Sequence, residues 1–439
     1  PLHEKGSVEG RERRLHKRRD FQIQIIGAMI SGTTSCGIKY AVRRSGSAVA
    51  YCSLGISAGT RYEDGFSSGI AHFTEHTLFR GTGRKSASVI NSYLDRLGGE
   101  LNAYTTKEEI VLHATVLKED LRKAGSLLME LATDPKFPED DIATERGVVI
   151  DEIKSYRDSP SDDVYDRFEE MLFRGHALSM PILGTPESVR GITSDELHRF
   201  VGEKFRPERM AFTVVADIDE KKMEALILRL AEKFFPDAPA VVPGGVAVPS
   251  RARLENVFSE TIVRKNHEAN AVIGGYAPSL YEEKERMAAI LLSNILGGPA
   301  SNSVLNSVLR EKHGWVYGVE SSYTQYSDTG IMAICLGCEK ENLDRCLAAV
   351  KKEIVRMQAI NLSDRALAAA KKQLLGQLAI SSDNGEAQCL SMGKSLLAYG
   401  RLQSREETAQ KIEAVTAEEI RMAACSIFSH GATSRLIMI

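Results

Sequence analysis

The amino-acid sequence predicts an α+β protein made of two duplicated, sandwich-like domains, each an antiparallel-rich sheet packed with helices. Three observations support this fold class. The 439 residues are enough for two or three domains of about 150 residues each. A segment with four prolines and two glycines, residues 236–250, separates two halves of similar length. Both halves combine strand-like and helix-like hydrophobic patterns in the same order, without the regular alternation of a parallel sheet.

The elements predicted for the two halves correspond one to one. The first half is predicted to form a strand (48–58), a helix through residues 72–76, a helix near 87–97, strands across 101–116 and a helix that begins at 118–121. The second half reads as a strand (271–276), helices at 283–296 and 301–312, strands across 317–336 and a helix that opens at 341–343. Leu121 and Leu343 are 222 residues apart, and this offset superimposes the elements to within a few positions. The sequence therefore predicts an internal duplication.

Domain boundaries follow from this division. We place the first domain at residues 34–235, the linker at 236–252 and the second domain at 253–439. Residues 1–33 are predicted to be an N-terminal extension, either processed or added by an expression vector, because the chain starts at Pro1 without methionine.

The composition is that of a soluble globular protein. Hydrophobic residues make up 43% of the chain, charged residues 26%, and the formal net charge is −3. This balance predicts no nucleic-acid partner. The longest apolar runs are shorter than the 18 residues of a membrane-spanning helix, so no membrane insertion is expected. Seven cysteines, an odd number, predict no disulfide framework and favour the cytoplasm.

The segment from His72 to His76, His-Phe-Thr-Glu-His, is the strongest chemical signal in the sequence. In a helix, histidines four residues apart lie on one face, where both imidazoles can reach one tetrahedral cation. Glu75 then lies beside that cation and can take the proton of a water molecule that attacks a carbonyl. The same string also fits a solvated helix face. The order His-x-x-Glu-His is that of the inverted zincin motif, which favours a metal site.

Two glutamates further along the chain complete this prediction. Glu145 and Glu152 are seven residues apart in a predicted helix, so both side chains lie on the same face. Glu152 is the predicted third ligand, and Glu145 supports the site from behind. For such a pair taken alone, an ordinary charged helix face is the simpler interpretation. At the 222-residue offset, the helix with the histidines aligns with residues 292–298, which contain none of these ligands, so one zinc ion per chain is predicted.

Two other patterns are interpreted as structural. Cys335 and Cys338 are spaced like a redox or metal pair, but they lie in an apolar run that reads as a buried strand, so we interpret them as core residues. Residues 81–86, GTGRKS, lack the spacing of a phosphate-binding loop, and nucleotide binding is not predicted.

The sequence resembles the pitrilysin, insulinase and mitochondrial-processing-peptidase family of zinc peptidases. The resemblance covers the chain from about residue 37 to the C-terminus. It is carried by the runs SAGTRYEDG (57–65), GIAHFTEHTLFRGT (69–82), LGGELNAYT (97–105), PILGTPE (181–187) and LREKHGWVYG (309–318).

This resemblance implies a role for each site residue. His72, His76 and Glu152 would bind zinc, Glu75 would be the catalytic base, and Glu145 would be the family's accessory glutamate. Arg310 and Tyr317 match the arginine and tyrosine that hold the substrate and stabilise the oxyanion in related enzymes. Without the family match, a surface arginine and a packed tyrosine would be the simpler interpretation. The strand from Leu101 through Asn102 and Ala103 to Tyr104 resembles the edge strand to which relatives add the substrate as an extra strand.

The function expected from these residues is that of a zinc metalloendopeptidase acting on peptides or unfolded segments. Relatives enclose their substrate with twice as many repeats as this chain carries, so the resemblance implies a homodimer with a chamber between its subunits. The alternative is a catalytically silent or partner-dependent subunit of the same fold, like the core proteins of the cytochrome bc complex. Such subunits have typically lost part of the zinc motif, which this chain keeps.

Overall fold

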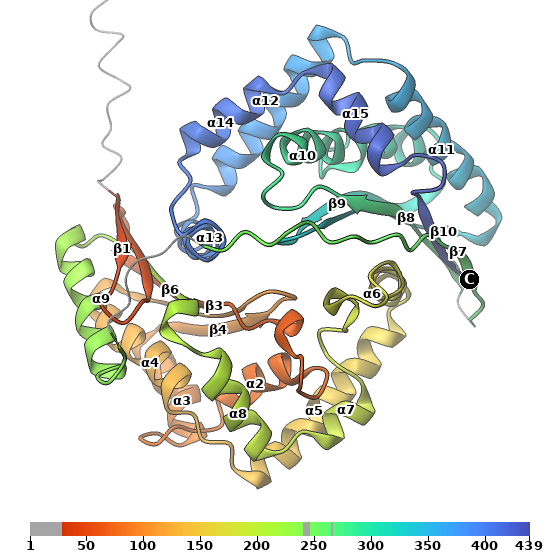
Figure 1. The fold of residues 1–439 in the computed structure, drawn as a ribbon. Helices are drawn as coiled ribbons and strands as arrows, with labels where there is room; N and C mark the ends of the chain where they lie inside the picture. Colours follow the sequence, from red (N-terminus) through yellow and green to blue (C-terminus); the bar gives the residue numbers. More distant parts are fainter. Residues whose placement is uncertain (1–28, 240–245, 265–266) are drawn as a thin grey trace, which may run out of the picture.

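The structure, a computed structural model, describes residues 29–239, 246–264 and 267–439. Two β-sheets face each other, and most helices cover their outer faces (Figure 1). Residues 1–28 of the expected extension and residues 240–245 of the expected linker lie outside the described residues. In the described part of the chain, no helix combines the length and the apolar character needed to cross a bilayer.

The first sheet has six strands in the order β1-β2-β6-β3-β5-β4. All neighbouring strands are antiparallel except β2 and β6, which are parallel. Residues 29–33, assigned to the extension from sequence, form the edge strand of this sheet. The strands are β1 (Met29–Thr33), β2 (Lys39–Arg44), β3 (Val49–Ile56), β4 (Glu100–Thr105), β5 (Ile110–Leu117) and β6 (Met210–Ala216).

The second sheet repeats this arrangement with five strands in the order β7-β11-β8-β10-β9. Its single parallel pair, β7 and β11, occupies the place that β2 and β6 hold in the first sheet. The strands are β7 (Ser259–Ile262), β8 (Glu268–Ala277), β9 (Val316–Gln325), β10 (Gly330–Glu339) and β11 (Ser434–Met438).

The helices also follow the same order in the two halves. Those of the first half are α2 (Ile70–Leu78), α3 (Ala87–Tyr93), α4 (Leu121–Thr133), α5 (Glu139–Asp158), α6 (Pro160–Leu172), α7 (Pro186–Gly191), α8 (Ser194–Lys204) and α9 (Glu220–Phe234). Those of the second half are α10 (Glu283–Gly297), α11 (Leu343–Ala359), α12 (Asp364–Ser381), α13 (Gly385–Tyr399), α14 (Arg405–Ala414) and α15 (Ala417–Ile427). Short 3-10 turns are η1 (Thr60–Tyr62), η2 (Asp95–Leu97), η3 (Lys118–Asp120), η4 (Ala177–Ser179), η5 (Pro207–Arg209) and η7 (Lys340–Asn342).

One element differs in type from the sequence prediction. The helix expected at 301–312 is, over most of its length, the π-helix η6 (Asn306–Lys312), which carries Arg310. In a π-helix each hydrogen bond joins residues five apart instead of the four of an α-helix. The wider turn changes the direction of the side chains that follow it. The hydrophobic period of so short a segment does not distinguish the two kinds of helix.

Helices α6 and α13 are exchanged between the two halves. Helix α6 belongs to the first half but packs on the inner face of the second sheet, where Phe168 contacts a core that includes Val272 and Leu436. Helix α13 belongs to the second half but packs on the first sheet, where Met392 lies in a cluster with Val215. Figure 1 shows both helices between the two sheets. Each half therefore supplies part of the other's core.

Candidate active site

Helix α2 carries the His-x-x-Glu-His segment and begins at a residue that must be glycine. Gly69 has a φ of 85°, and a Cβ atom there would lie 2.7 Å from the Cα of Gly184. Because glycine has no side chain to cap the helix, Glu63 does so from outside it. Its carboxylate accepts the N–H groups of Gly69 at 2.9 Å and Ala71 at 3.0 Å. Burial raises the pKa of Glu63 to about 8, although these N–H groups oppose the shift.

The structure brings His72, His76 and Glu152 together. Helix α2 supplies the two imidazoles and α5 supplies the carboxylate. One Glu152 oxygen, Oε2, lies 3.7 Å from Nε2 of His72 and 3.5 Å from Nε2 of His76. One ligand atom from each residue lies within 4.8 Å of the others, and within the described ranges no further His, Cys, Asp or Glu group meets this criterion.

These three side chains fit a zinc ion. Ligand atoms at about 2.1 Å from a tetrahedral cation are about 3.4 Å apart, close to the separations between Glu152 and the two imidazoles. The Oε2 atom of Glu152 is shielded from solvent and has no hydrogen-bond partner in the described part of the chain. A shielded carboxylate oxygen without a partner costs free energy, which a cation between the three side chains would recover.

The protonation of the two histidines is set by different surroundings. Burial, with a smaller effect from His76, lowers the pKa of His72 to about 3, so its imidazole is neutral, as a metal ligand must be. Burial also disfavours the charged form of His76, but the hydrogen bond to Glu145 and the nearby Glu75 and Glu152 outweigh it and raise the pKa. A cation bound there would displace that proton.

Glu145 orients His76 rather than facing the three ligands. Its Oε2 lies 3.1 Å from Nδ1 of His76, which leaves Nε2 free to point at Glu152. Arg80, four residues after His76, binds the other oxygen of the same carboxylate. Burial would favour the neutral form of Glu145, but the contacts with His76 and Arg80 lower its pKa below the usual value. Glu145 therefore lies behind His76, and its supporting role at a metal site stays a prediction.

Glu75 points into the same cavity and is held by the end of strand β4. The hydroxyl of Thr105 donates a hydrogen bond of 2.6 Å to its Oε2. Burial raises the pKa of Glu75, while this hydrogen bond and His76 oppose the shift. A carboxylate with a raised pKa accepts a proton more readily than an exposed one, as a general base requires.

The cavity that contains these residues has a volume of about 910 Å³. Ala103 and Tyr104 of the predicted substrate strand line it, whereas Leu101 and Asn102 lie further back on β4. Strand β4 is at the end of the first sheet and pairs only with β5 among the described strands. Its free edge can accept another strand. The segment from Met180 to Thr185 forms another part of the wall.

Arg310 and Tyr317 lie elsewhere in the chain. They share a second cavity of about 650 Å³ beside strand β9, and neither lines the cavity of Glu75 in the described structure. Tyr317 is 58% exposed, and its hydroxyl donates a 2.8 Å hydrogen bond to Glu339. Within one chain, the structure does not bring this pair to the three predicted ligands.

Three residues of the site were not identified from sequence: Glu63, Arg80 and Thr105. All three lie inside the runs that carry the family resemblance, at 57–65, 69–82 and 97–105. Position within those runs was the only available signal, because their partners are brought close by the fold and not by a local spacing.

Two family models together match most of the chain. The family model described as "Insulinase (Peptidase family M16)" matches residues 39–186, and "Peptidase M16 inactive domain" matches residues 191–374. An uncharacterized zinc protease of Streptomyces coelicolor is 30% identical over 83% of this chain and 80% of its own length. One of Bacillus subtilis is 29% identical over 87% of this chain and 91% of its own length.

Two solved structures show the same fold. A protease from Helicobacter pylori superimposes with a TM-score of 0.84 at 18% identity, over 94% of this chain and all of that one. A peptidase M16 inactive domain from Pseudomonas fluorescens gives 0.82 at 20% identity, over 94% of this chain and 98% of that one. The α+β fold with two sheets packed with helices is thereby confirmed.

Proposed function

This chain belongs to the insulinase family of peptidases (M16), and on that premise we propose that it is a zinc-dependent metalloendopeptidase that cleaves peptides or unfolded polypeptide segments. The observation that carries the proposal is the convergence of His72, His76 and Glu152, with Glu75 beside them in one cavity. The half matched by the inactive-domain model has no such group among its described residues, which supports one zinc ion per chain.

The roles of the residues follow from their positions. His72, His76 and Glu152 would hold zinc, which when bound supplies a Lewis acid that polarises a carbonyl and acidifies water. Glu75 takes the proton of the attacking water and then passes it to the departing amine, which completes the hydrolysis. Thr105 keeps the Glu75 carboxylate in place, and Glu145 keeps the His76 ring in place.

The substrate is proposed to bind as an added strand on β4. The free edge of β4 offers backbone N–H and C=O groups, and this strand ends at Thr105, which holds the base. Because main-chain groups are common to all peptides, this mode accepts many extended sequences. A folded protein offers no free strand of sufficient length, so it would be a poor substrate.

The second cavity supports a homodimer with shared active sites. Tyr317 can donate a hydrogen bond to a developing oxyanion, and Arg310 can hold the substrate backbone. Both lie in a cavity separate from Glu75, so we propose that they act on the zinc site of the partner subunit. The substrate chamber would then lie between two copies of this chain.

The proposed location of the protein is the cytoplasm, because the seven free cysteines of the chain suit a reducing compartment.

The alternative, a silent subunit of the same fold, is less well supported because the chain retains both the three ligands and the base. Digestion of a mixed library of extended peptides, analysed by mass spectrometry, separates the two. The proposed endopeptidase should leave internal cleavage products, and their formation should stop when a zinc chelator is added. A library that remains intact at high protein concentration would favour the silent subunit.

A further inference from the structure

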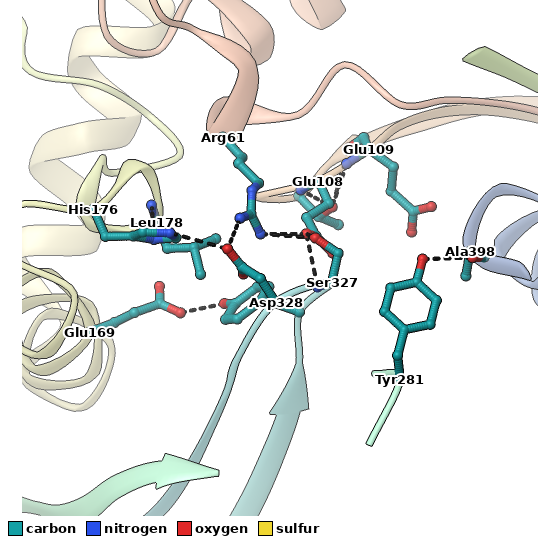
Figure 2. Close-up of polar contacts among 12 residues, drawn as sticks. Arg61, Glu108, Glu109, Glu169, His176, Leu178, Tyr281, Ser327, Asp328 and Ala398 are labelled. Atoms are coloured by element: carbon teal, nitrogen blue, oxygen red, sulfur yellow. Dashed lines mark hydrogen bonds and ion pairs between the residues drawn. The ribbon is translucent and has the colours of Figure 1, made fainter. Parts of the chain in front are cut away.

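The turn between strands β9 and β10 reaches out of the second sheet into the first half of the chain (Figure 2). We call residues 326–328 of this turn the docking tip. Its three consecutive side chains each contact a charged residue of the first half. Tyr326 donates a hydrogen bond to Glu169, Ser327 donates to Glu108 at 2.6 Å, and Asp328 forms an ion pair with Arg61.

The partners of the docking tip are bound to one another as well. Arg61 donates to Glu108 at 2.8 Å and to the Ser327 hydroxyl at 3.0 Å. The Nε2 atom of His176 lies 3.3 Å from the Asp328 carboxylate. Figure 2 shows Arg61 at the centre, between the docking tip and the turn that carries Glu108. The contacts therefore form one connected network across the two halves.

This network adjoins the wall of the candidate active site. Lys107 pairs with Glu169 at 3.2 Å, and its ammonium also donates to the carbonyl groups of Leu178 at 3.1 Å and Met180 at 2.6 Å. With His176 bound to Asp328 and the carbonyl of Met180 bound to Lys107, residues 176–180 are held at both ends. The chain then continues along the cavity to Gly184, which packs against the start of α2 at Gly69. We call residues 176–184 the wall segment.

The network also borders the predicted substrate strand and the metal helix. Lys107 and Glu108 lie in the turn directly after Thr105, which ends β4 and binds Glu75. The backbone N–H of Arg61 donates a hydrogen bond of 2.7 Å to the carbonyl of Lys107 in this turn. Two residues beyond Arg61, Glu63 caps α2. A displaced docking tip would therefore release the wall segment and the end of β4.

Burial makes these contacts specific. The side chain of Asp328 is 8% exposed and that of Arg61 13%, while Lys107 and Glu169 are 7% exposed each. Charges shielded from water to this extent are costly unless they are paired and hydrogen-bonded. The buried charges stabilise this one arrangement of the two halves over others, because any shift leaves a charge without its partner.

We propose that the docking tip is a positioning element of the active site, and that Asp328 is its principal positioning residue. The metal-free half thus shapes the site of its own chain, in addition to any contribution it makes to a partner. The docking tip holds the wall segment 176–184 and the end of the substrate strand in the conformation that binds an extended peptide. This inference rests on the proposed peptidase function.

The test is Asp328→Asn, which keeps the size of the side chain and removes its charge. Because the wall and the strand end bind substrate while the zinc ligands and Glu75 remain, KM for an extended peptide should rise about tenfold with kcat within about twofold. Zinc affinity, measured by chelator competition, should not change. Hydrogen exchange of the amides in 176–184 should become faster, because the segment is released.

Two further variants make the test specific. Thr213→Val removes a different buried hydrogen bond between the halves, from Thr213 to the carbonyl of Cys389 at 2.8 Å, and touches no residue of the wall. It should leave KM and exchange of 176–184 unchanged. Arg61→Gln should also raise KM and speed exchange of 176–184, and the double variant should cost less than the two single variants added together, since both break the contact between Arg61 and Asp328.

The possible outcomes separate this proposal from the peptidase function. An Asp328→Asn enzyme with KM and exchange of 176–184 both within twofold of the parent overturns the inference, as does an equal response to Thr213→Val. Loss of zinc in Asp328→Asn also overturns it, because the docking tip would then act on the metal site. A parent chain that cleaves no peptide contradicts the peptidase function instead, and the exchange measurement still decides whether the docking tip orders the wall.

Discussion

Replacing Glu75 with glutamine is expected to abolish turnover while leaving zinc and fold in place. The amide has the size of the carboxylate but cannot accept the proton of the attacking water. Removal of a general base should lower kcat by a factor on the order of 10² to 10⁴. Thr105 can still donate its hydrogen bond to the amide oxygen, so the side chain should keep its position. The measurement is the rate of peptide cleavage per zinc-loaded subunit.

Asp151→Asn is the matched control for this variant. Asp151 lies next to Glu152 on the same helix, but its side chain is 76% exposed and pairs with Lys154. Removing its charge should change the rate by less than a few fold. If Glu75→Gln retains activity within a few fold of the parent at equal zinc content, Glu75 is not the base.

Mixing two inactive variants should restore activity if the active sites are shared between subunits. A Glu75→Gln homodimer lacks the base in both sites, and an Arg310→Ala, Tyr317→Phe homodimer lacks the oxyanion and substrate contacts in both. In the mixed dimer, one of the two sites combines an intact Glu75 with an intact Arg310 and Tyr317. Free exchange makes half of the dimers mixed, so recovery towards a quarter of the parental activity is expected.

Subunit exchange must be shown independently, for example by energy transfer between differently labelled subunits. With exchange demonstrated, an inactive mixture would mean that Arg310 and Tyr317 serve the zinc site of their own chain. The two separate cavities within one chain would then have to merge by a movement of the two halves.

The duplication could be predicted from sequence because both halves show the same order of strand-like and helix-like hydrophobic patterns, which are local features. The 222-residue offset between Leu121 and Leu343 also relates α5 to α12 and α6 to α13, although α6, α12 and α13 were not assigned from sequence. The exchange of α6 and α13 between the sheets was not predicted. An amphipathic pattern shows that a helix has a buried face, but not which sheet covers that face.

In the candidate site too, local helical spacing could be predicted from sequence, whereas contacts between distant elements could not. The arrangement of His72 and His76 follows from helical spacing alone, and Glu145 and Glu152 share a face of α5 for the same reason. Thr105 reaches Glu75 only because β4 lies next to α2 in the folded chain. The spacing of residues along the sequence does not predict such a contact.

The pitrilysin and insulinase resemblance was confirmed by the family models, and it was more informative than composition or periodicity. The roles of the individual residues stay predictions, because similarity of the whole chain does not measure what a given side chain does. The Oε2 atom of Glu152, which has no hydrogen-bond partner among the described residues, is the feature of this structure that points most directly to a cation.

One zinc ion, held by His72, His76 and Glu152, is proposed to make this chain a peptidase, and a zinc titration tests this role most directly. The protein is stripped with a chelator and zinc is returned stepwise while cleavage of an extended peptide is followed. Activity should be absent at first, rise in proportion to zinc and reach its plateau at one zinc ion per chain, whereas a His72→Ala, His76→Ala variant should not respond. Full activity in the stripped protein, or an equal response of that variant, would contradict this role of zinc.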